Sequence, residues 1–326
     1  MPDTLVTGAT GLLGATLTRA LVTRGADVRI FRRPTSPLHL LGDAVDAVEH
    51  AEGDITDPLA VRDAMRGIRR VYHGAALIRF GGQADRQALR AVNVQGTAHV
   101  VNAALAEGID RLAHVSSMAA LGRPVHGDGL VDESHPWTRA AQRSVYAVSK
   151  RDSELEVHRG IAEGLDAVIV NPALIFGPGR SGENTQRMVE AVREERVPAV
   201  PPGGTNVVDV RDVADGLIRA MHLGPTGARF FLGSENLSFQ EIFDTLAEAF
   251  GAARAQRQAP ALLVRGAAAV AEGVATLTGT RPLLSREQAR SATTMVRYSN
   301  RKARTQLECT FRPFSETARW LAERLG

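Results

Sequence analysis

Close to the N-terminus the chain carries the stretch Thr7-Gly8-Ala9-Thr10-Gly11-Leu12-Leu13-Gly14. The apolar run 4–6 before it predicts a strand, and the apolar-periodic segment after it, up to about residue 24, predicts a helix. A glycine-rich turn in this place lets the backbone approach a pyrophosphate, and a helix N-terminus offers N–H groups and partial positive charge to phosphate. The spacing G-x-x-G-x-x-G differs from G-x-G-x-x-G. Its position nevertheless favours dinucleotide binding by Gly8, Thr10, Gly11, Leu12, Leu13 and Gly14 over a purely structural turn.

Beyond this turn, short apolar runs alternate with longer amphipathic segments, which is typical of a parallel sheet covered on both faces. Further strands are predicted at 28–31, 47–49, 70–73, 112–116, 167–170 and 230–232, and helices at 84–107, 146–163 and 184–195. Residues 207–221 predict a strand followed by a helix, and from residue 238 onward the pattern is mostly helical. The fold class is therefore α/β, a Rossmann doubly wound parallel sheet with a smaller, mostly helical C-terminal substrate domain. We expect a dinucleotide-binding domain over 1–175 plus about 207–235, and a substrate-binding domain over about 176–206 plus 236–326.

The end of the second predicted strand indicates the cofactor. NAD-binding sites place a carboxylate there to accept from the ribose 2′-hydroxyl. This chain instead has Arg32 and Arg33 in Val28-Arg-Ile-Phe-Arg-Arg-Pro34. Two guanidinium groups could bind a 2′-phosphate, so the sequence favours NADP(H) over NAD(H). Ordinary surface arginines are the alternative, because the chain uses arginine freely.

Two further loops fall at predicted strand ends. Asp54, followed by Ile55, could accept from the adenine amino group, and the small residues Gly74, Ala75 and Ala76 would allow close approach of the backbone to a cofactor. Each is also ordinary loop chemistry, since aspartate in a turn is commonly a cap.

The segment Tyr146-Ala-Val-Ser-Lys150 carries the clearest chemical pattern. Residues four apart on a helix share a face, so the phenol and the ammonium point into one cleft. A nearby cation lowers a tyrosine pKa, which prepares the phenol for proton transfer. The chain has three tyrosines, and only two of its 39 basic residues are lysines, Lys150 and Lys302. The pair is therefore unexpected from composition, with a surface pair as the alternative.

These motifs resemble the extended short-chain dehydrogenase/reductase superfamily, the NAD-dependent epimerase/dehydratase family. The resemblance runs through TGATGLLG, GDITDP, HGAA, NVQGT, VSSMAALG, YAVSK, NPALIFGPG and RDVADG to Tyr298-Ser-Asn-Arg-Lys-Ala303. It implies Ser117 and Tyr146 at the reacting oxygen, with Ser117 preferred to Ser116 because a small-residue run follows it. It also implies that Lys150 binds the nicotinamide ribose and lowers the Tyr146 pKa, and that Asn93 is a structural and proton-relay residue. Cofactor contacts are further implied for Pro172, Leu174 and Ile175.

The segment NPALIFGPG indicates which subgroup of this family the chain resembles. Nucleotide-sugar epimerases and dehydratases typically have R-x-x-N-x-x-G-P, whereas Asn171 and Leu174 stand at the two polar positions here. The chain is more similar to the dihydroflavonol-reductase-like carbonyl reductases, and to bacterial proteins of hopanoid clusters that are named sugar epimerases. Dehydratases of this family commonly carry acidic residues directly after the serine that corresponds to Ser117. None follows Ser117 here, which argues against an elimination reaction.

Three functions follow from the resemblance. The first is an NADPH-dependent reductase, or reversible alcohol dehydrogenase, for a small or medium, partly apolar ketone or aldehyde. The second is an NAD-dependent nucleotide-sugar epimerase or dehydratase that keeps NAD⁺ tightly bound, and the third is a non-catalytic NADP-binding regulator. The substrate pocket is expected along 77–83, 118–123, 174–180 and 283–298, including Arg79, Arg123 and Arg180. Family members commonly form homodimers, here through helices near 84–107 and 146–163.

Composition excludes several other classes. The net charge is +3 with a pI of about 9.5, the basic excess looks small and scattered, and 5% of residues are aromatic. This argues against nucleic-acid binding. The single cysteine, Cys309, suits a reducing, cytoplasmic location, and the histidines show no metal-ligand spacing, so no metal site is expected. The Ala/Leu-rich segment 259–280 contains Arg265 and Glu272, so we expect a packed helix and no membrane span.

Overall fold

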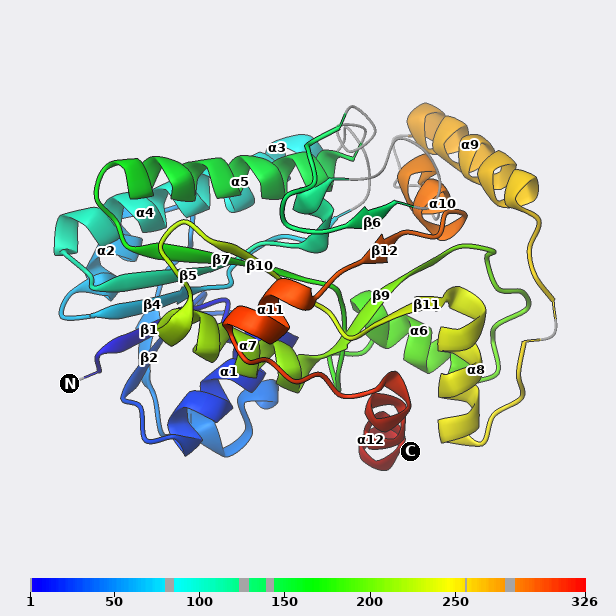
Figure 1. Ribbon diagram of the computed structural model, residues 1–326, viewed down its shortest axis with the longest axis horizontal. Coiled ribbons are helices and arrows are strands. Elements are labelled where there is room, and N and C mark those ends of the chain that lie inside the picture. The colour runs from blue at the N-terminus through cyan, green and yellow to red at the C-terminus, as the bar shows by residue number, and fades with distance from the viewer. Residues whose placement is uncertain (1, 80–84, 123–128, 139–143, 256, 279–284) are drawn as a thin grey trace.

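The computed structural model describes residues 2–79, 85–122, 129–138, 144–255, 257–278 and 285–326. Seven parallel strands form its central sheet: β1 (Thr4–Thr7), β2 (Val28–Arg32), β3 (Glu49–Glu52), β4 (Arg70–His73), β5 (Arg111–Val115), β7 (Ala167–Pro172) and β10 (Arg229–Leu232). Their order is β10-β7-β5-β4-β1-β2-β3 (Figure 1). The chain adds strands first on one side of β1 and then on the other, and sheets of this kind bind dinucleotides at the point where the strand order reverses in this way.

Helices cover both faces of this sheet, as Figure 1 shows. α1 (Leu12–Thr23) and α7 (Val210–Leu223) pack on one face, and α2 (Pro58–Met65), α4 (Gly96–Glu107) and α5 (Val145–Ala162) lie on the other. All residues of β1 and β7 are buried, as expected for strands covered on both sides. The predicted Rossmann fold class is confirmed.

Two predicted elements differ from the structure in detail. The third strand, predicted at 47–49, begins only at Glu49. The helix predicted over 84–107 is divided into α3 (Arg86–Leu89), a π-helical segment (Arg90–Gln95) and α4. Such a segment widens one helical turn and is frequent at functional sites. Asn93 lies within it.

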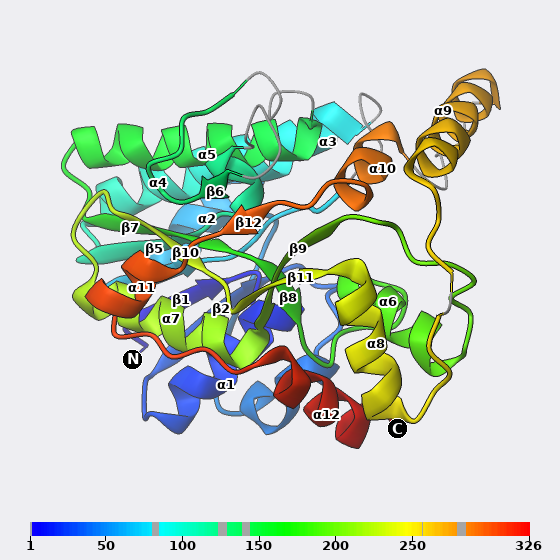
Figure 2. The same ribbon diagram turned by 45° about the vertical axis from the view of Figure 1, so that its right-hand side comes forward.

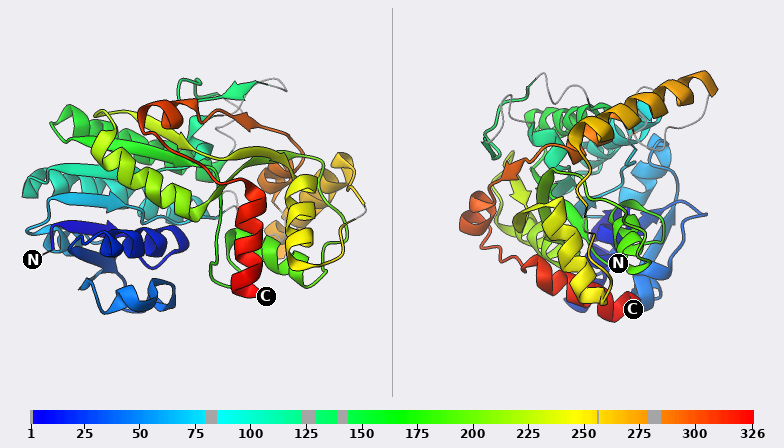
Figure 3. Two further views of the ribbon diagram at one scale, coloured as in Figure 1. Left: turned by 60° about the horizontal axis from the view of Figure 1, so that its bottom comes forward. Right: turned by 90° about the vertical axis from the view of Figure 1, so that its right-hand side faces the viewer.

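A second layer follows β7 in the chain. β8 (Leu174–Phe176), β9 (Gly204–Asp209) and β11 (Glu235–Ser238) form a three-stranded sheet. β9 agrees with the strand predicted at the start of 207–221, whereas β8 and β11 were not predicted. α6 (Asn184–Arg193), α8 (Phe239–Phe250) and α12 (Phe314–Leu325) surround a separate apolar cluster with Phe176. Figure 3 shows α12, which ends the chain, beside α8.

The last region carries α9 (Ala261–Thr278), α10 (Arg286–Ala292) and α11 (Arg301–Gln306), with β12 (Arg297–Tyr298) paired to β6 (Leu130–Val131). The helix predicted within 259–280 is present as α9, but the expectation that it is packed is wrong along one face, where Leu262 and Leu263 are exposed. None of the helices that the structure describes combines the length and apolar character of a membrane-spanning segment. The domain boundaries stay a prediction.

Candidate active site

The glycine-rich turn joins β1 to α1 and requires its glycines. Gly8 has a φ of +72°, and a Cβ there would lie 2.6 Å from the carbonyl carbon of Gly74. A Cβ on Gly14 would lie 2.1 Å from the oxygen of Gly8. Gly11 caps α1, and no described side chain bonds to the N–H groups of that first turn. Because glycine side chains cannot block these N–H groups, the turn fits a dinucleotide pyrophosphate.

The loop after β4 lies against the same turn. The N–H of Gly74 donates to the Thr7 carbonyl at 3.1 Å, and the N–H of Ala75 donates to Thr7 Oγ1 at 3.2 Å. Ala76 follows on this loop. Ile55, from the loop after β3, is buried against Gly96 at the start of α4. The structure thus brings the predicted loops after β1, β3 and β4 to the carboxyl edge of the sheet.

The two arginines after β2 have different surroundings. Arg32 donates to Glu52 Oε1 at 2.6 Å and to His50 Nδ1 at 2.9 Å, so its guanidinium is engaged on the edge strand β3. Arg33 is exposed, and its charge contributes to a lowered pKa of Asp54. Of the pair, Arg33 is therefore the one whose guanidinium faces solvent near the cofactor loops.

Asp54 forms a local turn. Its Oδ1 accepts from the N–H and the hydroxyl of Thr56, at 2.9 and 2.7 Å, and these hydrogen bonds are the main causes of its lowered pKa. Asp54 therefore forms a turn with Thr56, whereas the cap of α2 is Asp57, and the adenine contact of Asp54 stays a prediction.

Arg180 is a residue whose place the sequence did not indicate. It was expected in the substrate pocket, but its guanidinium donates to the Thr10 carbonyl of the glycine-rich turn and to the Pro37 carbonyl at 3.3 Å. Nearby, Gly177 leaves room for Leu12, since a Cβ there would lie 3.1 Å from Leu12 Cδ1. The segment that follows β8 therefore packs against the glycine-rich turn. Leu174 and Ile175, which belong to β8, immediately precede this segment.

Ser117 and Tyr146 meet at the end of β5. Ser117 begins a short 3₁₀ turn (Met118–Leu121), and its Oγ accepts from the Ala119 N–H at 3.2 Å. Its side chain shares a hydrogen bond with the buried phenol of Tyr146, which comes from the first turn of α5. The hydroxyl of Ser116 is buried without a hydrogen-bond partner in the described structure. The geometry therefore pairs Tyr146 with Ser117.

Burial governs the proton affinity of this pair. It raises the pKa of Tyr146 to about 12, against the opposite effect of the Ser117 hydrogen bond. The expected lowering of this pKa by Lys150 is not found, because burial of the phenol and the Ser117 hydrogen bond are the causes of the shift and Lys150 is not among them. The phenol is consequently protonated at neutral pH.

Lys150 lies one turn further along α5 and is 2% exposed. Its Nζ donates to the Val115 carbonyl at the end of β5 at 2.9 Å. Burial lowers its pKa to about 8, and the charge of Glu154 opposes this shift. The other lysine, Lys302, donates to the Arg229 carbonyl at 2.8 Å and packs over Phe230, so it anchors α11 to β10.

Asn93 connects the π-helical segment to its neighbours. Its Oδ1 accepts from the Leu77 N–H at 2.7 Å, and its Nδ2 donates to the Leu77 carbonyl and to Ser149 Oγ, both at 3.0 Å. These bonds use both sides of the amide and fix the loop after β4 against α5. They support a structural role, and the proton-relay role stays a prediction.

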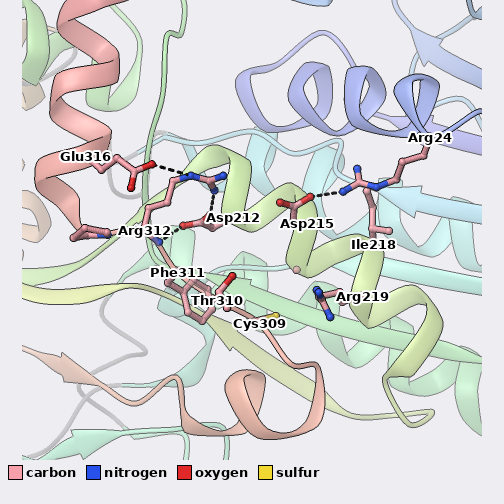
Figure 4. A pocket seen from close by; sticks show the side chains of 12 residues that line it. Arg24, Asp212, Asp215, Ile218, Arg219, Cys309, Thr310, Phe311, Arg312 and Glu316 are labelled. Carbon is pink, nitrogen blue, oxygen red and sulfur yellow. Dashed lines mark hydrogen bonds and ion pairs between the residues drawn. The ribbon is translucent and has the colours of Figure 1, made fainter.

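Parts of the predicted substrate pocket lie outside the described residues, namely 80–83, 123 and 283–284. Arg79 is described and pairs with Asp85 at 3.4 Å, while Pro172 is buried at the end of β7. A cavity of about 570 Å³ lies elsewhere, between α7, Arg24 at the C-terminal end of α1, and residues 309–316 (Figure 4). Ion pairs cross it, Arg312 with Asp212 and Arg24 with Asp215, so its charges are mutually compensated and it contains none of the predicted site residues.

Known proteins resemble this chain over most of its length. The model of the NAD dependent epimerase/dehydratase family matches residues 4–233. Sterol demethylase protein B of Methylococcus capsulatus is 37% identical over 81% of this chain and 80% of its own. A putative dihydroflavonol 4-reductase of Synechocystis is 34% identical (93% and 88%), and 2-alkyl-3-oxoalkanoate reductase of Stenotrophomonas maltophilia is 32% identical (78% and 77%). The crystal structure of gox2253 superposes with a TM-score of 0.84 at 31% identity, over 100% of this chain and 99% of that one.

Proposed function

This chain belongs to the NAD dependent epimerase/dehydratase family of NAD(P)-dependent oxidoreductases, and from that premise we propose that it is an NADPH-dependent reductase of a partly apolar ketone or aldehyde, with the reverse alcohol oxidation. The observation that carries the proposal is the hydrogen bond between Ser117 and Tyr146, with Lys150 one turn away. Ser117 and Tyr146 are the catalytic pair, Lys150 binds the nicotinamide ribose, and Asn93 supports them.

In the reductive direction the two hydroxyl groups bind the substrate carbonyl oxygen and stabilise the negative charge that develops on it. The bound nicotinamide cofactor supplies the hydride. Tyr146 then gives its phenolic proton to the substrate oxygen. A phenol with a pKa of about 12 holds this proton throughout the neutral range, which suits an acid in reduction better than a base in oxidation.

The cofactor site comprises the glycine-rich turn, the loops with Asp54 and Gly74, and residues 172, 174 and 175. NADP(H) is preferred because Arg33 is exposed at the position where NAD sites carry an acid. Arg32 is held by Glu52, so we assign the 2′-phosphate to Arg33 rather than to the pair. Replacing Arg33 by Ala should raise KM for NADPH about tenfold and leave KM for NADH unchanged.

A partly apolar substrate is supported by Leu174, which replaces the polar residue of sugar-nucleotide enzymes. The names of the relatives agree, since they refer to a sterol, a flavonoid and an alkyl-oxoalkanoate. We further propose a cytoplasmic homodimer that pairs through α4 and α5, where Leu155 is 49% exposed. Light scattering of wild type and of Leu155→Glu tests this interface.

The deciding experiment compares Tyr146→Phe with Tyr72→Phe. Tyr72 is a second buried tyrosine, on β4, and it has no proposed role in catalysis. Tyr146→Phe should lower kcat for carbonyl reduction by about 10²-fold or more and leave the Kd of NADPH unchanged. Tyr72→Phe should keep the kcat of the wild-type protein. Equal turnover by the two variants contradicts the mechanism. Denaturing the purified protein separates the epimerase alternative, because stoichiometric release of NAD⁺ would favour it. An intact nucleotide site with no turnover on a panel of carbonyl compounds would favour the regulator.

A further inference from the structure

α9 carries an unusual concentration of exposed apolar side chains. Nine large apolar residues are exposed in the part of the chain that the structure describes, and four of them lie on this helix. Leu262 is 85% exposed, Leu263 and Val270 are each 68% exposed, and Val274 is 54% exposed. At about 100° per residue, these four side chains fall within roughly 120° of one another around the helix axis, so they share one face. A Cβ added to Gly266 or Gly273 would meet nothing within 4 Å, so this face is open along its length.

The charged residues of α9 point the other way. Arg265 donates to Thr293 Oγ1 at 2.9 Å at the end of α10. Glu272 accepts from the Arg286 N–H at 2.8 Å and pairs with its guanidinium at 3.2 Å. α9 therefore turns its charges toward its own protein and its leucine and valine side chains outward, the reverse of an ordinary surface helix.

The region around α9 also carries a local excess of positive charge. Residues 254–290 contain six arginines and two glutamates, a net charge of +4, whereas the chain totals +3 and the remainder is therefore −1. Residues 291–326, with seven basic and three acidic residues, also carry a net charge of +4, so the basic excess of the chain is spread beyond this region as expected. Arg257 and Arg290 are exposed, and no ion pair of either is described. An apolar helix face beside arginines is the pattern of a segment that lies in the interface of an anionic membrane.

We propose that α9 lies flat on an anionic lipid bilayer, with Leu262, Leu263, Val270 and Val274 in the headgroup region and the neighbouring arginines on the acidic lipids. Figures 1 and 2 show α9 projecting at one end of the molecule, where a flat surface can reach it. The proposed membrane contact lies close to the helix that carries Tyr146. Glu287 of α10, which packs on α9, accepts a hydrogen bond from Ser144, and Ser144 caps α5 two residues before Tyr146.

A second copy of the chain is a poorer occupant. An 18-residue helix is roughly 27 Å long and 10 Å wide, so one face offers about 270 Å², a third of the roughly 800 Å² per partner of a standard interface. Two copies would also bring two regions of net charge +4 together. A bilayer requires neither a larger area nor a complementary protein shape.

The test is sedimentation of the full-length protein with vesicles of phosphatidylcholine alone or mixed with phosphatidylglycerol at about three to one. Wild type should bind the mixed vesicles and lose binding as salt is raised, because screening weakens the arginine contribution. Leu262→Gln combined with Leu263→Gln should weaken binding about tenfold or more. Arg257→Gln combined with Arg290→Gln should weaken binding to the mixed vesicles only.

The matched control is Leu59→Gln, since Leu59 is 73% exposed on α2, away from α9. It should bind like wild type. The proposal is overturned if wild type stays in solution with both vesicles, or if the leucine variant binds as wild type does. It is also overturned if that variant loses only self-association in light scattering, which would identify a second copy as the occupant. Sedimentation requires no turnover, so the result is independent of the proposed reductase activity.

Discussion

The side-chain nitrogen of Asn171 lies 2.6 Å from Oε1 of Glu154, and both residues are fully buried. The same nitrogen donates to the Ser117 carbonyl at 2.9 Å. The other oxygen of Glu154 accepts from Arg151 at 3.0 Å and from Arg229 at 3.2 Å, which compensates the buried carboxylate. Asn171 thus ties the backbone of Ser117 to a fixed acid on α5, and we infer that it is a positioning residue.

Asn171→Leu should therefore misplace the Ser117 hydroxyl. We expect kcat for reduction to fall about tenfold, with little change in KM for NADPH, because no described cofactor loop depends on this amide. Steady-state kinetics with saturating NADPH measure the split. A rise in KM for NADPH at constant kcat would contradict the positioning role.

Glu154→Gln tests the electrostatic half of the same network. The charge of Glu154 opposes the lowering of the Lys150 pKa, so its removal should move that pKa below about 8. Reduction should then decline at a lower pH in the variant than in wild type. The pH profile of kcat is the measurement, and superimposable profiles would show that Glu154 does not act on Lys150.

Burial of Lys150 should cost stability. Its pKa is about 8 in the folded protein against 10.5 otherwise, so the unfolded chain binds more protons between about pH 8 and 10.5, and stability rises with pH across this window. Below pH 8 the cost is fully present. Lys150→Met should therefore stabilise the protein by roughly 2 kcal/mol at pH 7, after the lost hydrogen bond to Val115 is included.

Thermal unfolding at pH 7 and pH 10 measures this effect. Tm should rise by a few degrees at pH 7, with a smaller difference at pH 10, while reductase activity is lost. Lys302→Met is the control, because Lys302 also donates to a backbone carbonyl but packs over Phe230, and its loss should lower Tm. A lower Tm for Lys150→Met at pH 7 would show that the charge is compensated in place.

The sequence predicted those parts of the site that depend on local spacing. The glycine-rich turn and the pair Tyr146 and Lys150 each lie within one turn and one helix, so chain order suffices to place them. Arg180 reaches Thr10 across 170 positions, and an arginine among many gave no reason to choose it. Glu154 could have been found, because it follows Lys150 by the same four positions.

The sequence pattern also does not predict which of two opposing physical effects on a residue is the larger. The motif predicted that Lys150 would lower the pKa of Tyr146, but only the structure shows that burial raises it. Similarly, periodicity predicted a helix at α9 but not which face would be covered, because that depends on α10 and its contacts with Arg265 and Glu272.

Arg180 should matter for cofactor binding, since it holds the glycine-rich turn and the loop at Pro37 together. Arg180→Met keeps much of the side-chain volume and removes these bonds. We expect Kd for both NADPH and NADH to rise several-fold, to the same degree, because the pyrophosphate that we propose to bind at this turn is common to both. Fluorescence titration measures both constants. A change confined to NADPH would instead assign Arg180 to the 2′-phosphate.

The buried histidine at the end of β4 should make the protein sensitive to acid. His73 lies between Thr7 Oγ1, at 2.7 Å, and Thr97 Oγ1, at 3.0 Å, and burial together with the charge of Lys150 lowers its pKa to about 3. The unfolded chain, with a pKa of 6.5, therefore binds more protons between about pH 6.5 and 3. Stability should fall as pH drops through this window, by roughly 1.4 kcal/mol per pH unit from this residue.

Urea unfolding at pH 7, 6, 5 and 4 measures the slope. His73→Gln should lower stability at pH 7, because the two threonine bonds are disturbed, yet its stability should depend less on pH by about that amount per unit. His39→Gln is the control, because His39 is exposed and should leave the slope unchanged. His114 is buried beside His73 and its pKa is lowered for the same reasons, so part of the acid sensitivity should persist in His73→Gln. Equal slopes for wild type and His73→Gln would mean that His73 is already charged in the folded protein.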